Sequence, residues 1–223
     1  IFLADGDALV VPTELLLDIL QFIRLRFPNR ERVTAYATAR DICRKTTEEL
    51  TMLKNAGLTM VYVGAESGDE QILKAVRKNV SVEELKEAAG KLKEAGIQLS
   101  LTLISGLGGR ERMEQHALCS ANLVSAMKPE YLGFLTLLLE EDMTIMKEIR
   151  SERLHLLSPE EVVEEMKLFL KHVDAPGTIF RANHASNYIA LRGTLNKDIP
   201  IMLQHLAKAE ENQRFKDEDY RRF

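Results

Sequence analysis

Apolar, strand-like segments recur along this chain at intervals of about thirty residues, the length of one strand–helix unit with a right-handed crossover. They begin near positions 2, 33, 60, 98 and 131, and a helix-like stretch follows each of them. Because the strands are continuously apolar, the pattern predicts a parallel sheet that is covered on both faces. Since only five units are visible, we expect an α/β fold with a partial parallel (β/α) barrel.

The chain divides into three parts that differ in their patterns: a partial barrel core, an appended mostly helical region with one short strand, and a charged tail. We expect these parts to cover residues 1–142, 143–209 and 210–223. Within the appended region, the polar stretch from Asn183 to Thr194 is expected to be irregular. The mixed charges of the tail predict a frayed, solvated helix end.

Composition excludes several classes of partner. The 30 basic and 34 acidic residues nearly balance, and no basic stripe with aromatic residues appears, so no nucleic-acid or membrane surface is expected. No apolar run approaches the roughly 20 residues that span a bilayer. With two distant cysteines and no secretory leader, the chain is expected to be cytoplasmic. Its start at Ile1, without a methionine, suggests that preceding residues were trimmed or not included.

Polar residues and glycines follow the ends of the predicted strands. In a parallel sheet these ends meet at one edge, so residues distant in sequence are expected to converge there. The leading candidate is Glu66, which ends the buried segment MVYVGAESG. The full set at the strand ends is Asp5, Gly6, Asp7, Arg40, Glu66, Ser67, Ser105, Gly106 and Glu140.

Two further groups of residues suit small ligands. Arg77, on the helix predicted after Glu66, could pair with a ligand carboxylate, although an exposed helix arginine is commoner. A polar cluster after the barrel could line a substrate pocket, or could be a surface loop that satisfies its own backbone. Its candidate substrate residues are Asn183, His184, Asn187 and Arg192.

Together, these segments resemble the radical S-adenosylmethionine (radical SAM) superfamily over residues 1–142. The most specific piece is VGAESG followed by DEQILKAVRK, which resembles a Glu-Ser-Gly loop and the helix after it. Asp5-Gly6-Asp7 is similar to the Gly-Gly-Glu turn that receives the amino group of the methionine moiety. The stretch LISGLGGRE resembles the glycine motif that holds adenine. The C-terminal RANHASNYIALRGTL is similar to coproporphyrinogen oxidase-like and Fe-S oxidoreductase-type members.

The resemblance implies roles for particular residues. Glu66 and Ser67 would lie near the ribose or methionyl end of S-adenosylmethionine, and Arg77 would take its carboxylate. Ile104 and Gly106 would contact adenine. The family's reaction also implies a [4Fe-4S] cluster, an electron donor and an unknown substrate from which hydrogen is abstracted.

The cluster-binding motif of three closely spaced cysteines is absent from this chain. Cys43 and Cys119 are too few and too far apart to replace it, so no metal is expected to bind here. The chain is therefore expected to start at the family's second strand and to be inactive alone. An exposed sheet edge at Ile1 to Leu3 would then favour a homo-oligomer.

Two other functions remain open from the residues. One is a metal-dependent (β/α)-barrel hydrolase or aldolase, with Glu66 as acid or base and a metal at Asp5, Asp7 and Glu140. The other is a non-catalytic binding module. No residue of the chain is assigned a catalytic role by its sequence.

Overall fold

A computed structural model describes residues 1–4, 6–139 and 145–221. Within these residues, seven strands form one sheet and are hydrogen-bonded in chain order from β1 to β7. β1 is parallel to β2, β2 to β3, and β5 to β6, whereas β7 is antiparallel to β6. The mostly parallel sheet with its helices confirms the expected α/β fold class. None of the described helices is long and apolar enough to span a membrane.

Contacts between residues divide the chain into two compact units. Unit 1 holds Ile1–Gly64 and Glu83–Leu101, and unit 2 holds Ala65–Val82 and Thr102–Phe223. Strands β3 and β4 contribute residues to both. The elements of unit 1 are β1 (Phe2–Leu3), η1 (Ala8–Val10), α1 (Thr13–Arg26), β2 (Val33–Tyr36), α2 (Ala39–Arg44), α3 (Thr47–Ala56), most of β3 (Leu58–Glu66), α5 (Val82–Ala95) and the start of β4 (Gln98–Ser105).

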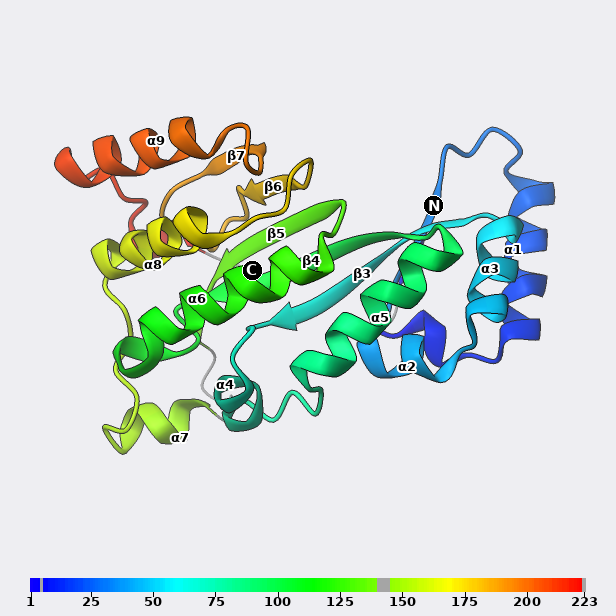
Figure 1. The fold of residues 1–223 in the computed structure, drawn as a ribbon, viewed down its shortest axis with the longest axis horizontal. Coiled ribbons are helices and arrows are strands. Elements are labelled where there is room, and N and C mark those ends of the chain that lie inside the picture. Colours follow the sequence, from blue (N-terminus) through cyan, green and yellow to red (C-terminus); the bar gives the residue numbers. More distant parts are fainter. Residues whose placement is uncertain (5, 140–144, 222–223) are drawn as a thin grey trace. The chain divides into compact units, whose positions relative to one another are not determined.

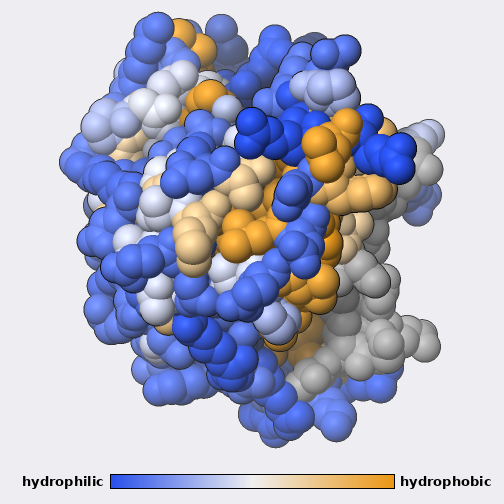
Figure 2. Space-filling model, turned by 90° about the vertical axis from the view of Figure 1, so that its right-hand side faces the viewer, coloured by the Kyte–Doolittle hydropathy of each residue, from blue (hydrophilic) through white to orange (hydrophobic). Residues whose placement is uncertain are grey.

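The core of unit 1 follows helical spacing. Helix α1 buries Leu16, Leu20 and Ile23, which are three or four positions apart and therefore share one face. Its other faces carry exposed apolar residues, among them Phe22 and Leu25. Figure 2 shows apolar residues on one surface of the molecule, surrounded by hydrophilic ones.

The second strand ends before Arg40, which was expected to lie at a strand end. It ends at Tyr36, and α2 begins at Ala39. The side chain of Thr38 accepts a hydrogen bond from the N–H of Asp41, which caps the helix and turns the backbone. Arg40 thus lies on a helix and not on a strand end.

Unit 2 contains the rest of the sheet and the C-terminal helices (Figure 1). In Figure 1, helices α6 and α8 lie side by side, in agreement with their contacts. Besides the ends of β3 and β4, the elements of unit 2 are α4 (Glu70–Ala75), α6 (Gly109–Met127), β5 (Tyr131–Thr136), α7 (Ile145–Arg150), α8 (Pro159–His172), β6 (Ile179–Ala182), β7 (Leu191–Thr194), α9 (Ile199–Glu211) and η2 (Glu218–Tyr220).

The core of unit 2 is built on aromatic contacts. The ring of Phe134 on β5 lies 5.0 Å from that of Phe169 on α8 and 5.9 Å from that of Phe180 on β6. All three side chains are buried. Helix α8 begins with a capping box between Ser158 and Glu161, which satisfies backbone N–H groups at its start. This packing fixes α8 against one face of β5.

Two expectations for the C-terminal part are wrong. The stretch expected to be irregular contains β7, which pairs with β6. The appended region therefore has two strands instead of one. The tail follows the end of α9 at Glu211 and is exposed at residues 211–214 and 217–220, although the side chain of Arg221 is only 5% exposed.

Burial alternates along β3, β4 and β5, although both faces were expected to be covered. Leu103 and Ser105 of β4 are buried, whereas Thr102 and Ile104 are only half-buried. Leu132, Phe134 and Thr136 of β5 are likewise buried, and the residues between them are half-buried. Successive side chains of a strand point to opposite faces, so one face of each strand packs more closely than the other.

Candidate functional site

Glu66 occupies a strained position at the end of β3. Its φ of +67° lies in the left-handed region, which non-glycine residues rarely adopt. The carboxylate accepts a hydrogen bond from Nζ of Lys78, and the Glu66 side chain is 26% exposed. Such backbone outliers often mark functional positions, because the surrounding structure must hold them in place.

The three residues after Glu66 are occupied by contacts within the protein. Ser67 is buried, and its hydroxyl accepts the N–H of Asp69 at 3.0 Å. A Cβ on Gly68 would lie 2.3 Å from the carbonyl oxygen of Cys119, so only glycine fits beside α6. Asp69 caps α4 and accepts two hydrogen bonds from Arg112. Glu66 is therefore the residue of this loop that can meet a ligand, and the expected contact of Ser67 stays a prediction.

The cation beside Glu66 is Lys78, which the sequence reasoning missed. Arg77, expected to lie on the helix, follows the end of α4 with a φ of +58° and is exposed. Its expected contact with a ligand carboxylate stays a prediction. Two consecutive basic residues after a short helix were the available signal, and side-chain direction decides which of them faces Glu66.

A buried carboxylate accepts hydrogen bonds from the turn after β4. Oε2 of Glu165, on α8, accepts the hydroxyl proton of Ser105 and the N–H of Gly106 at 2.8 Å. Gly106 has a φ of +80°, which glycine adopts without strain. Glu165 is 1% exposed, and Nδ1 of the buried His116 lies 3.2 Å from its Oε1. Neither Glu165 nor His116 was expected to belong to a site.

A cavity of about 360 Å³ lies beyond the carboxyl ends of β4 and β5. Its walls are mostly leucine and valine, with three polar side chains from the segments near the C-terminus. The lining residues are Gly106, Thr136, Leu137, Leu138, Leu139, Leu156, Leu157, Val162, Tyr188, Glu218 and Arg221. Small-molecule sites commonly occupy such a position in α/β folds. Ile104 does not line the cavity, because its side chain leaves β4 on the face opposite Ser105.

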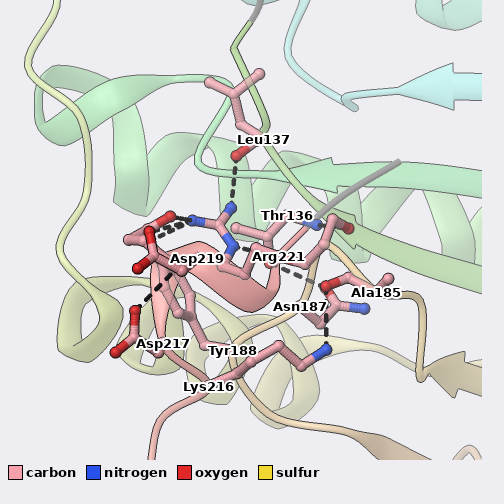
Figure 3. Close-up of polar contacts among 11 residues, drawn as sticks. Thr136, Leu137, Ala185, Asn187, Tyr188, Lys216, Asp217, Asp219 and Arg221 are labelled. Atoms are coloured by element: carbon pink, nitrogen blue, oxygen red, sulfur yellow. Dashed lines mark hydrogen bonds and ion pairs between the residues drawn. The ribbon is translucent and has the colours of Figure 1, made fainter.

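Arg221 ties the C-terminal segment to this cavity (Figure 3). Its guanidinium donates to the carbonyl oxygens of Leu137 and Ser186 at 2.7 and 2.6 Å, and lies 4.0 Å from the ring centre of Tyr188. It also donates to both carboxylate oxygens of Glu218 at 2.7 Å. Burial, with a hydrogen bond to Glu218, raises the pKa of Tyr188 to about 12.

Of the four candidate substrate residues in the polar cluster after β6, one is buried and three are exposed. Asn187 is buried, where it accepts from the hydroxyl of Thr136 and donates to the carbonyl of Phe134. Asn183, His184 and Arg192 are exposed. Asn187 thus stabilises β5 through hydrogen bonds. The substrate contacts expected for these four residues stay predictions. The neighbouring Tyr188 is the member of this cluster that lines the cavity.

The N-terminal turn belongs to unit 1. Asp5 and Glu140 lie outside the described residues. Gly6 has a φ of +87°. Asp7 accepts the N–H groups of Leu9 and Thr38, each at 2.9 Å, and partial burial raises its pKa. Asp7 thus fastens the turn to the end of β2, and its expected role toward a ligand stays a prediction.

The described residues do not fit an iron–sulfur cluster. They contain no group of three or more His, Cys, Asp or Glu side chains that could hold a metal. Burial raises the pKa of the thiols of Cys43 and Cys119, which disfavours the thiolate form that binds iron. Glu66 fits a cosubstrate better, because its carboxylate is 26% exposed.

The sequence profile described as the radical SAM superfamily matches residues 1–118. The chain belongs to the radical SAM superfamily. The match covers Glu66 and the glycine turn at Gly106, which carried the resemblance seen in the sequence. No protein with a curated functional description matches this radical SAM chain.

Several solved structures share the fold. Archaeal Elp3 from Methanocaldococcus infernus matches 96% of this chain with a TM-score of 0.64 and 14% identity. Coproporphyrinogen III oxidase HemN from Escherichia coli, a radical SAM enzyme, matches 74% with a TM-score of 0.59 and 16% identity. HydG, a maturase of the [FeFe]-hydrogenase, matches 80% with a TM-score of 0.53 and 17% identity. The chain spans 54%, 38% and 39% of these proteins, respectively.

Proposed function

We propose that these 223 residues form the cosubstrate-binding part of a radical SAM enzyme that cleaves S-adenosylmethionine and abstracts hydrogen from a substrate. The observation that carries the proposal is the match to the superfamily over the strands that place Glu66 and Gly106. When bound, the [4Fe-4S] cluster of such an enzyme supplies the electron for cleavage. Its cysteine ligands would come from residues outside this chain, because the sequence holds two cysteines.

Glu66 would lie near the ribose or methionyl end of the cosubstrate and would accept a donor of the cosubstrate in place of Lys78. The side chains of Glu66 and Lys78 are 26% and 28% exposed, respectively. Replacing Lys78 by another donor therefore requires little desolvation. Ile104 and the Cα side of Gly106 would support adenine, because an apolar half-buried side chain and a residue without a Cβ suit a flat ring. An electron donor and a substrate are further partners under this proposal.

The test begins with the gene product that contains this chain. We expect its remaining sequence to include three closely spaced cysteines. After reconstitution with iron and sulfide, it should show the visible absorbance of a cluster and release 5′-deoxyadenosine with a reductant. Glu66→Gln should raise the concentration of S-adenosylmethionine needed for half-maximal cleavage, while the exposed control Glu83→Gln should not. A reconstituted protein without a cluster would refute the proposal.

A further inference from the structure

The cavity beyond β4 and β5 combines apolar walls with one buried cation. Leu137, Leu139, Leu157 and Val162 supply aliphatic surface, and Arg221 supplies the charge. At about 360 Å³ the cavity falls in the range of about 300–1,000 Å³ that is common for small-molecule sites. It therefore suits a molecule with an apolar body and one anionic group.

The guanidinium of Arg221 is held in a fixed orientation. Nη2 donates to the carbonyl of Leu137, Nε donates to the carbonyl of Ser186, and the plane lies over the ring of Tyr188. These partners are neutral, and the side chain is 5% exposed. A buried cation without an anion is costly, so the third nitrogen, Nη1, needs a negative partner.

Glu218 supplies that negative partner from an exposed position. Both of its oxygens lie 2.7 Å from Nη1 of Arg221, but its side chain is 63% exposed. It stands on the single-turn helix η2, three residues before the arginine. Because Glu218 is the exposed partner, it can move into water when another carboxylate takes its place, and the buried cation is then never left without an anion.

We propose that this cavity binds a small aliphatic carboxylic acid, whose carboxylate displaces Glu218 from Arg221 while its apolar chain packs against the leucine walls. Arginine suits this exchange because its planar donors match a carboxylate. The Tyr188 hydroxyl, which now donates to Glu218, would donate to the incoming carboxylate.

This cavity shares Gly106 with the site proposed for the cosubstrate, but neither Glu66 nor Ile104 lines it. The cavity includes Val162 and Leu157 and lies toward α8, whose Glu165 contacts the Ser105 face of β4. Ile104 points to the opposite face. The inference thus goes beyond the proposed function and does not depend on it.

Octanoate is a suitable probe, with 1-octanol as its neutral counterpart, and titration calorimetry on the 223-residue chain measures both. We expect octanoate to bind at least about tenfold more tightly than 1-octanol, because hydrogen bonds to a charged group are strong. Arg221→Gln should remove this preference. Glu218→Gln should strengthen octanoate binding by up to about fivefold, because the internal competitor is lost.

Glu148→Gln is the matched control, because Glu148 forms an exposed ion pair with Arg153 in the same unit and does not line the cavity. It should leave octanoate binding unchanged. Equal binding of octanoate and 1-octanol would overturn the proposal, as would unchanged or weaker octanoate binding by Glu218→Gln. Displacement of octanoate by S-adenosylhomocysteine would also overturn it, because the cavity would then be the cosubstrate's. If Arg221→Gln loses its fold by circular dichroism, Glu218→Gln decides the question.

Discussion

Tyr188 lies at the cavity, where it is buried and contacts two charged side chains. Its hydroxyl donates to Glu218 and accepts from Arg221, while its ring packs against the guanidinium. Burial is the main cause of its raised pKa, because the tyrosinate would lose water. The neutral phenol therefore stabilises the folded chain.

This shift predicts a pH dependence of stability. The pKa of Tyr188 rises from 10.0 to about 12 on folding, so its contribution is complete below pH 10 and is lost as pH rises toward about 12. The free energy of unfolding of the wild type should fall more steeply over this window than that of Tyr188→Phe. Urea unfolding at several pH values measures both slopes. Tyr220→Phe, which removes a phenol that is 68% exposed, should keep the wild-type slope.

The sequence located Glu66 and Gly106, but it missed their partners. A carboxylate at a strand end and a glycine turn are visible as local patterns. Lys78 contacts Glu66 across 12 residues, and Glu165 contacts Gly106 across 59. Arg221 likewise reaches the cavity through its contact with Leu137, across 84 residues. No local pattern encodes such a separation, so the partners of the site became visible only in the folded chain.

At the scale of elements, α8 determines the shape of the β4 end. Glu165 is the acceptor for two donors of that turn, and its burial leaves no water to replace it. Glu165→Ala should lower the free energy of unfolding by about 1–3 kcal/mol for each donor left without an acceptor. Glu165→Gln keeps an acceptor oxygen and should cost less. Urea denaturation gives these values, and amide exchange at Gly106 should accelerate in Glu165→Ala.

The neighbouring Glu164 provides a control on the same helix. Its side chain is 52% exposed, so Glu164→Ala should change stability by less than about 0.5 kcal/mol. Equal losses for Glu165→Ala and Glu165→Gln would contradict the assigned role, because they would show that charge or packing, and not the acceptor, stabilises the turn.

Elements with strong local signals were predicted well from the sequence. Capping boxes begin helices α3 and α8 at Thr46 and Ser158, and the Glu three positions after each of these residues makes them recognisable from the sequence. Helix α2 was missed because apolar alternation continues up to its capping Thr38. Strand β7 was missed because its residues, Leu-Arg-Gly-Thr, have weak strand propensity and depend on pairing with β6.

At the scale of the whole molecule, the order of the sheet leaves β1 at one edge and β7 at the other. β7 carries the exposed Arg192, and charge on an edge strand opposes pairing with another chain. β1 instead carries Phe2, which is 41% exposed and contacts the rings of Tyr36 and Tyr62. We propose that β1 is the edge through which copies of this chain associate.

Association through β1 predicts a dimer whose fraction rises with protein concentration. Phe2→Lys should shift the chain toward the monomer, because an edge lysine opposes strand addition. Light scattering after size exclusion measures the mass. Phe22→Lys removes a similarly exposed phenylalanine from α1, at 57%, and should keep the dimer. A wild-type chain that stays monomeric at all concentrations would exclude this association.

The overall class was predictable because strand and helix periods alternate regularly from residue 1 to the end of β5. The uneven burial of the two sheet faces could not be predicted, because the half-buried face and the buried face both contain apolar residues in this chain. Tyr131, Gly133 and Leu135 on β5 are half-buried, yet they read as part of one continuous apolar run.

The anchoring of Arg221 also affects how proteases meet this chain. Trypsin cleaves after basic residues whose side chains can enter its pocket, and the buried guanidinium of Arg221 is engaged by the protein itself. Arg214, which follows α9, is exposed. Cleavage there would leave the segment from Phe215 onward attached only by non-covalent contacts, among them those of Lys216 with Ala185 and of Arg221 with Leu137. Limited digestion would thus weaken the attachment of the cavity's cation without any substitution.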